Sequence, residues 1–122
     1  MAYEIPGDKI GTLNAGADFS EKQFYAVEQT ATDVELPADG KSMLGVLQNK
    51  PLEGQPCEIM TSSVTKAVGG DAIAKGKKVA ISGGKFIEAV ATKVIVGTAL
   101  DACGADGELF TLEIGNEGIM PA

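Results

Sequence analysis

Glycine and proline interrupt this sequence so often that no room is left for long regular elements. The 122 residues include 16 glycines and 5 prolines. Between these breaks lie short runs rich in β-branched and aromatic residues, and no segment keeps a helical apolar period over three turns. The pattern predicts an all-β fold, a small β-barrel or β-sandwich-like domain with little helix. The expected strands are residues 24–28, 34–36, 43–47, 57–61, 64–67, 78–82, 85–88, 93–100 and 109–114.

Two pairs of these runs are typical of hairpins. Gly83 and Gly84 separate residues 78–82 from 85–88, and two glycines at this place predict a type I′ turn, which needs positive φ at both positions. Residues 57–61 and 64–67 bracket Ser62 and Ser63, which suggests a second, hairpin-like pair.

The last run, residues 109–114, alternates with Phe110, Leu112 and Ile114 on one face and Thr111 and Glu113 on the other. Such alternation is typical of a strand with one face in the core. The expected core residues are Val79, Ile81, Phe86, Ile95, Leu109, Phe110 and Leu112.

Residues 1–18 differ from the rest, and we predict an extended N-terminal arm there, followed by a single β domain over residues 19–122. Three glycines and a proline interrupt every element that could form in the arm. It nevertheless carries apolar residues at intervals that an extended strand could use. One interpretation is a loose terminus, and the other is a segment ordered only against a partner. The candidate anchors are Tyr3, Ile5, Ile10 and Leu13.

The charge balance and the missing residue types argue against several functions. Ten basic and seventeen acidic residues give a net charge of −7, so binding to nucleic acid is not expected. The chain has no histidine, the commonest general base and metal ligand. The two cysteines, Cys57 and Cys103, are expected to be buried, free thiols. We predict no catalytic, cofactor-binding or metal-binding residues, no signal peptide, and no membrane span.

The sequence contains two kinds of near-match to known functional motifs. Gly40-Lys41-Ser42 matches the end of a phosphate-binding loop, but Glu35 stands where its first glycine should be. Small all-β carrier domains present a lysine for biotin or lipoate at a turn, and Lys41, Lys75 and Lys85 lie beside glycine-containing turns. None of these lysines has the flanking residues of such carriers. A carrier domain and a free-standing surface-binding module remain the alternative functions.

The order of turns along the chain resembles the capsid cement, or head decoration, proteins of tailed bacteriophages. The resemblance runs from about residue 24 to residue 114. It rests on five segments of the sequence: Gly45-Val46-Leu47, Gly54-Gln55-Pro56-Cys57-Glu58-Ile59, residues 70–76 leading to Val79 and then Gly83-Gly84, residues 95–100, and Asp106-Gly107-Glu108-Leu109-Phe110.

This resemblance implies a structural protein that is made in the host cytoplasm and added to the outer surface of the virion. Its partner would be the phage major capsid protein. Such proteins often sit as homotrimers at three-fold and quasi-three-fold positions, where they fasten the shell against the pressure of packaged DNA. The resemblance implies neither a cofactor nor an enzymatic activity, and the arm anchors become candidate capsid-interface residues.

Overall fold

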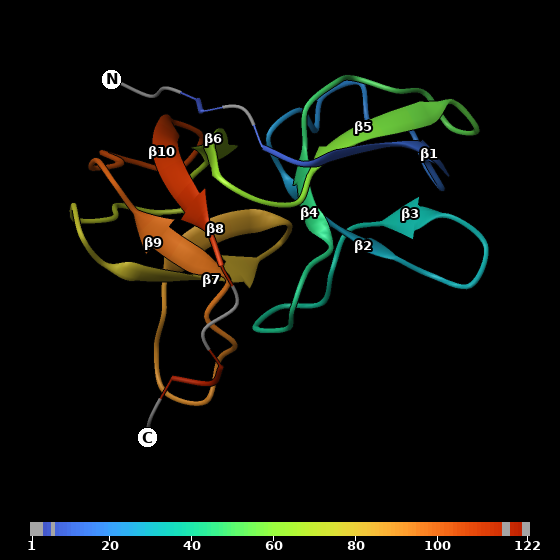
Figure 1. Ribbon diagram of the computed structural model, residues 1–122. Coiled ribbons are helices and arrows are strands. Elements are labelled where there is room, and N and C mark those ends of the chain that lie inside the picture. Colours follow the sequence, from blue (N-terminus) through green and yellow to red (C-terminus); the bar gives the residue numbers. More distant parts are fainter. Residues whose placement is uncertain (1–3, 6, 116–117, 121–122) are drawn as a thin grey trace.

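The computed structural model describes residues 4–5, 7–115 and 118–120, and the described residues contain strands and no helix. Ten strands form two antiparallel five-stranded sheets that lie side by side (Figure 1). The first sheet contains β1 (Lys9–Asn14), β2 (Ala26–Gln29), β3 (Val34–Glu35), β4 (Gly45–Leu47) and β5 (Pro56–Met60). The second contains β6 (Val64–Val68), β7 (Lys78–Ser82), β8 (Lys85–Glu88), β9 (Gly97–Ala99) and β10 (Leu109–Ile114). The predicted all-β fold is confirmed.

The two sheets have the same topology. The strand order is β1-β5-β4-β2-β3 in the first and β6-β10-β9-β7-β8 in the second. In each, the residue after the first strand makes a parallel bridge to the third strand, Ala15 to Val34 and Gly69 to Phe86. These bridges curl each sheet toward a small barrel. We call residues 9–60 repeat 1 and residues 64–114 repeat 2, and we call two residues equivalent when they hold the same place in the two repeats.

The duplication extends to individual backbone hydrogen bonds. The N–H of Phe24 donates to the Leu47 carbonyl at 2.7 Å, and in repeat 2 the N–H of Gly76 donates to the Ala99 carbonyl at 2.8 Å. Phe24 and Gly76 both have positive φ, as do two further equivalent pairs, Gly40 with Thr92 and Gly54 with Gly107. The sequence shows no strict repeat because the two halves share backbone geometry rather than side chains.

Glycine is required at one equivalent pair by close packing. A Cβ atom on Gly45 would overlap the Met60 carbonyl, and one on Gly97 would overlap the Glu113 carbonyl. Both glycines start the fourth strand of their repeat, which pairs with the fifth strand. A side chain at either position would force the two strands apart.

The core is divided between the repeats. One buried cluster lies in repeat 1, and a larger one fills repeat 2 and extends to Ala26, Met43 and Val46 of repeat 1. Six of the seven predicted core residues are buried: Val79, Ile81, Phe86, Ile95, Phe110 and Leu112.

The seventh, Leu109, is a correction, because 44% of it is exposed. It is the first residue of β10, and the alternation that points Phe110 inward points Leu109 outward. Thr111 is fully buried instead of facing solvent. The backbone N–H and the hydroxyl of Thr111 both donate hydrogen bonds to the Asp101 carboxylate.

The Gly83-Gly84 turn has φ values of 61° and 79°, which confirms the predicted turn with positive φ at both positions. The expected hairpin at Ser62-Ser63 is wrong. β5 pairs with β1 and β4 in the first sheet, whereas β6 pairs with β10 in the second. Of the two serines only Ser63 has positive φ, so the connection does not fold back as a type I′ hairpin and instead leads from one repeat to the next.

Part of the predicted arm belongs to the first sheet. Lys9–Asn14 forms β1 at the edge of that sheet and pairs with β5, with a bulge between Ile10 and Leu13. The expectation that its glycines keep this segment from pairing within its own chain is therefore corrected. Neither Gly11 nor the bulge prevents the ladder, because an edge strand needs only one partner. For residues 1–8 the arm stays a prediction.

Candidate functional site

The described residues before β1, the N-terminal segment, contact β6 and the connection between the two repeats. The N–H of Ile5 donates to the Val64 carbonyl of β6 at 2.9 Å, and the N–H of Thr61 donates to the Asp8 carbonyl at 2.9 Å. The N–H of Asp8 also donates to the Ser62 hydroxyl at 3.0 Å. Ile5, Gly7 and Asp8 therefore lie beside the connection between β5 and β6, on the surface of the protein.

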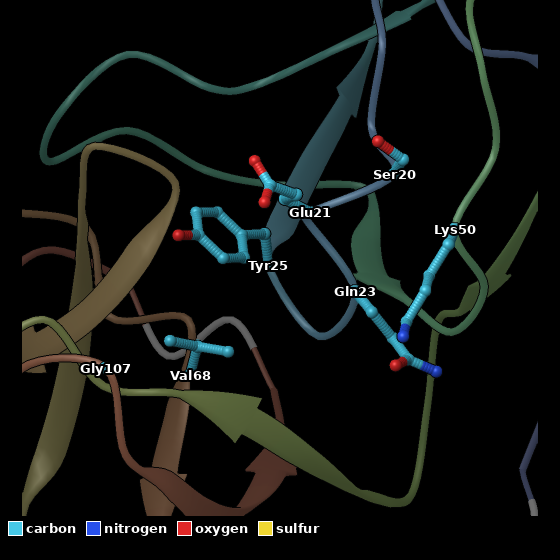
Figure 2. A pocket seen from close by; sticks show the side chains of 7 residues that line it. All are labelled: Ser20, Glu21, Gln23, Tyr25, Lys50, Val68 and Gly107. Carbon is cyan, nitrogen blue, oxygen red and sulfur yellow. The ribbon is translucent and has the colours of Figure 1, made fainter.

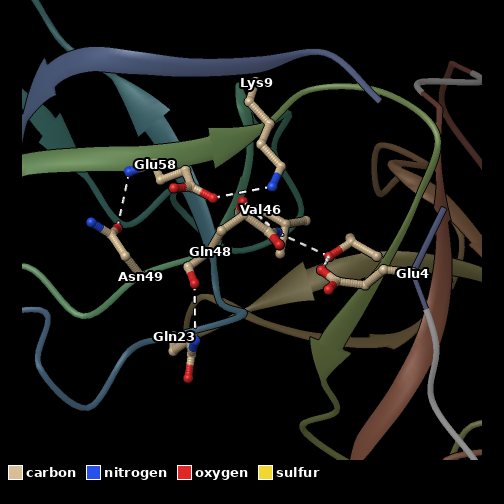
Figure 3. A network of polar contacts seen from close by, with 8 residues as sticks. Glu4, Lys9, Gln23, Val46, Gln48, Asn49 and Glu58 are labelled. Atoms are coloured by element: carbon tan, nitrogen blue, oxygen red, sulfur yellow. Dashed lines mark hydrogen bonds and ion pairs between the residues drawn. The ribbon is translucent and has the colours of Figure 1, made fainter. Parts of the chain in front are cut away.

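A chain of polar contacts links this segment to the interior (Figure 3). The Thr65 hydroxyl lies 3.1 Å from the Glu4 carboxylate and accepts a hydrogen bond from Gln48 Nε2 at 2.9 Å. The Gln48 carbonyl in turn accepts a hydrogen bond from Gln23 Nε2. Thr65 is fully buried, so these bonds satisfy a polar group that would otherwise be costly to bury. The network holds the N-terminal segment, β6 and the loop after β4 together.

Three of the four sequence-predicted interface residues lie in the described part of the chain, and they differ in how far their side chains are exposed. Tyr3 lies outside the described residues. Ile5 is 49% exposed, and Ile10 on β1 is half-buried. Leu13 packs against the core cluster of repeat 1, so its side chain contributes to the protein's own stability. Ile5 and Ile10 are thus the described candidates that present apolar surface outside the core.

An open groove lies between the two repeats (Figure 2). It has a volume of about 350 Å³ and is lined by Ser20, Glu21, Gln23, Tyr25, Lys50, Val68 and Gly107. Tyr25 extends from the start of β2 toward repeat 2, and Lys22 Nζ lies 5.0 Å from the centre of its ring. The groove has both polar and apolar walls.

The charged groups with shifted pKa values lie outside this groove. Burial raises the pKa of Glu35, and the nearby carboxylates of Asp33, Glu53 and Glu28 raise it further. Burial also raises the pKa of the Asp101 carboxyl, but the backbone N–H and hydroxyl of Thr111 outweigh it and hold that pKa below its usual value.

Several of the remaining chemical candidates have structural roles, whereas Lys41 and Lys75 are exposed at the surface. The N–H of Gly40 donates to the Ile81 carbonyl at 2.8 Å, so it serves the contact between the repeats. Lys85 forms an ion pair with Asp106 at 2.8 Å. Cys57 and Cys103 are both free and buried, as predicted, and burial raises the pKa of each thiol.

Among the residues that the structure describes, no group of three or more histidine, cysteine or carboxylate side chains is placed to hold a metal ion. No helix in the described ranges is long and apolar enough to cross a membrane.

The comparisons with known proteins identify the family. The family model for phage cement proteins matches residues 6–114, which is most of the chain, and the chain therefore belongs to the phage cement protein family. Its members are structural proteins of the phage head, and this assigns the chain to the virion capsid in a structural, non-enzymatic role.

The fold also occurs in a solved structure, the head fiber gp8.5 N base of bacteriophage phi29. The similarity has a TM-score of 0.76 at 13% sequence identity and covers 94% of this chain and 100% of that chain. At this identity the likeness concerns the fold alone. No curated protein sequence matches this chain.

Sequence reasoning missed the residues that join the two repeats. Phe24, Tyr25 and Leu36 read as ordinary members or neighbours of strands, yet they contact repeat 2. The Leu36 and Tyr25 side chains lie against Gly84, with atoms 3.1 Å from where a Cβ would stand. The recurrence of glycine at equivalent places, such as Gly45 with Gly97 and Gly54 with Gly107, is the signal that could have shown the duplication.

Proposed function

We propose that this protein is a capsid decoration protein that binds the outer surface of a phage head and stabilises the shell against the internal pressure of packaged DNA. The observation that carries the proposal is the family match over residues 6–114. The partner is the phage major capsid protein, and the protein binds as a homotrimer at three-fold and quasi-three-fold positions after synthesis in the host cytoplasm. Its net charge of −7 suits a protein that works beside DNA-filled shells without binding DNA.

We place the attachment surface on the N-terminal segment. The backbone N–H of Ile5 is bonded to the Val64 carbonyl of β6, and about half of the residue is exposed. Tyr3 and Ile10 are its apolar neighbours in sequence, while Leu13 is committed to the core. Apolar anchors of this kind contribute roughly 1.5–3 kcal/mol each when a partner buries them, before ordering costs are subtracted.

The test is co-sedimentation of the purified protein with expanded capsids that lack it. The full chain should sediment with the shells and saturate at a fixed number of copies. Ile5→Glu should lower the affinity by roughly tenfold or more. Leu52→Glu is the matched control, because this substitution adds the same charge at a similarly exposed leucine. Leu52 is 50% exposed and lies in a loop of repeat 1.

The outcomes separate the parts of the proposal. If the two variants bind equally well, the N-terminal segment is not the attachment surface. If the unmodified protein fails to sediment with any expanded shell and binds cells instead, the decoration role is wrong and the surface-binding module is favoured.

A further inference from the structure

The two repeats contact each other through two different faces. Repeat 1 contributes its forward face, residues 24–26, 36 and 39–40, and repeat 2 contributes its receiving face, Val68 with residues 81–85. Four hydrogen bonds join these two faces: Val68 N–H to the Phe24 carbonyl at 3.1 Å, Ala26 N–H to the Gly84 carbonyl at 2.8 Å, Gly40 N–H to the Ile81 carbonyl at 2.8 Å, and Gly83 N–H to Asp39 Oδ1 at 2.7 Å. Two more join the repeats outside these faces, Val94 N–H to the Gly40 carbonyl at 3.0 Å and Gln48 Nε2 to the Thr65 hydroxyl at 2.9 Å. The contact is head to tail, because the faces differ.

Because the repeats share one fold, each face exists twice in the chain. Repeat 1 has its own receiving face, formed by Asn14 and residues 29–33, and repeat 2 has its own forward face, which includes residues 76–78. The receiving face of repeat 1 borders an open cavity of about 210 Å³, lined by Thr12, Leu13, Asn14 and residues 29–33. The equivalent place in repeat 2 is occupied by Phe24 and Tyr25 of repeat 1.

Exposure separates the used faces from their equivalents. Ile81 and Gly84 are buried in the contact between repeats, whereas the equivalent Gln29 and Thr32 are exposed. On the forward face, Tyr25 is half-buried and the equivalent Lys77 is exposed. The second pair of faces is therefore open to solvent around Lys77 and around Gln29 and Thr32 in a single copy of the chain.

The side chains at the centre of the open faces have opposite charge. In the internal contact the Tyr25 ring packs on Gly84, next to Lys85. The positions equivalent to Tyr25 and Lys85 are Lys77 and Asp33. If a second copy repeated the internal contact, the ammonium group of one copy would meet the carboxylate of the other. Surface charges arranged in this way guide association and select the partner.

We propose that a second copy of this chain docks head to tail, with the forward face of repeat 2 against the receiving face of repeat 1 of the next copy and Lys77 paired with Asp33. Two of the four hydrogen bonds between the internal faces have no counterpart. The Thr92 N–H, equivalent to that of Gly40, already donates to the Met120 carbonyl, and the position equivalent to Asp39 is Ala91, which has no carboxylate. The contact between copies is thus centred on residues 76–78. This proposal rests on the proposed function in one respect. The head-to-tail contact would join the copies of the proposed trimer, since such a contact can close into a ring.

The competing account is that these two faces are polar end caps, which repeat proteins use to stay soluble. Sedimentation velocity over a range of protein concentrations, without capsids, distinguishes the two. The unmodified protein should self-associate, and Lys77→Glu should weaken the association about tenfold. Lys50→Glu is the matched control, because it makes the same charge change at an exposed site away from both open faces. The double variant Lys77→Asp with Asp33→Lys should recover most of the association.

Cross-linking tests the head-to-tail geometry directly. A variant with Lys77→Cys and a second variant with Asp33→Cys should be joined by a short bismaleimide when mixed, and neither should cross-link alone. The native cysteines are buried and do not compete. A protein that stays monomeric at every concentration, or that gives no cross-link in the mixture, would overturn the proposal. Neither result depends on capsid binding, so failure here is distinguishable from failure of the decoration role.

Discussion

The glycine turn between β7 and β8 offers a measurement of how tightly the two repeats are packed. We consider Gly84→Val with Gly83→Val as its matched control. Both glycines have positive φ, 79° and 61°, so both substitutions place a side chain in the left-handed region. That strain costs about 1–2 kcal/mol for a residue with a Cβ.

The two positions differ in what a side chain would meet. At Gly83 nothing lies within 4 Å of the added Cβ, whereas at Gly84 the Leu36 and Tyr25 side chains lie 3.1 Å away. Forcing extra atoms into such a contact costs about 1–3 kcal/mol. We therefore expect a loss of about 1–2 kcal/mol for Gly83→Val and about 2–5 kcal/mol for Gly84→Val.

Urea denaturation followed by far-ultraviolet circular dichroism measures both losses. Equal losses at the two positions would show that Leu36 and Tyr25 move aside freely and that the contact between repeats is loose. A loss below about 0.5 kcal/mol at both positions would contradict the type I′ turn itself.

Three further predictions concern stability and the thiols. Phe110 is fully buried and packs edge to face on Phe86 with ring centres 6.1 Å apart, so Phe110→Ala should lower the free energy of unfolding by about 3–5 kcal/mol in the same denaturation assay. The folded pKa of Asp101 is lowered, so its contribution to stability is present above the ordinary value of 3.8 and is lost as the pH falls through the folded pKa. Acid titration of the unfolding free energy should show this loss in the unmodified protein and not in Asp101→Asn. Cys57 and Cys103 should react slowly with a thiol reagent in the folded protein and completely once it is denatured; finding no free thiol after denaturation would contradict the structure.

Local turn chemistry made much of this fold predictable. Most strand positions and the Gly83-Gly84 hairpin follow from residues close together in the sequence, because turn type depends on a few φ angles. The exceptions are β1, which was expected to be part of an arm, and the run over residues 93–100, of which only Gly97–Ala99 is a strand. Ser62-Ser63 shows where this reasoning fails. The strands on both sides were found, but which sheet each joins is decided by distant partners, β1 and β4 for one and β10 for the other.

The recurring glycines were the sequence signal of the duplication, and the contact between repeats had no such signal, for a related reason. Equivalent positions carry chemically different residues: Phe24 with Gly76, Tyr25 with Lys77, and Asn49 with Asp101. In the last pair both side chains accept a hydrogen bond from the backbone N–H of the fifth strand, Glu58 in repeat 1 and Thr111 in repeat 2. The fold constrains the acceptor oxygen and leaves the residue type free. Local sequence patterns do not reveal a constraint of this kind.

The capsid-interface prediction was limited in the same way. The apolar spacing of Ile5, Ile10 and Leu13 is real, but spacing cannot tell an anchor for a partner from an anchor for the chain's own core. Leu13 is of the second kind, because it faces the buried cluster of repeat 1. Ile5 is half exposed while its backbone N–H is bonded to Val64, and it therefore stays a candidate for partner contact.

The most direct test of the central claim is the stability of DNA-filled particles with and without this protein. Particles are heated in steps, and DNA release is followed with a dye that cannot enter intact shells. If the protein cements the shell, particles lacking it should release DNA at a lower temperature, and adding the purified protein back should restore the higher one. Identical release temperatures for bare and fully decorated particles would contradict the claim.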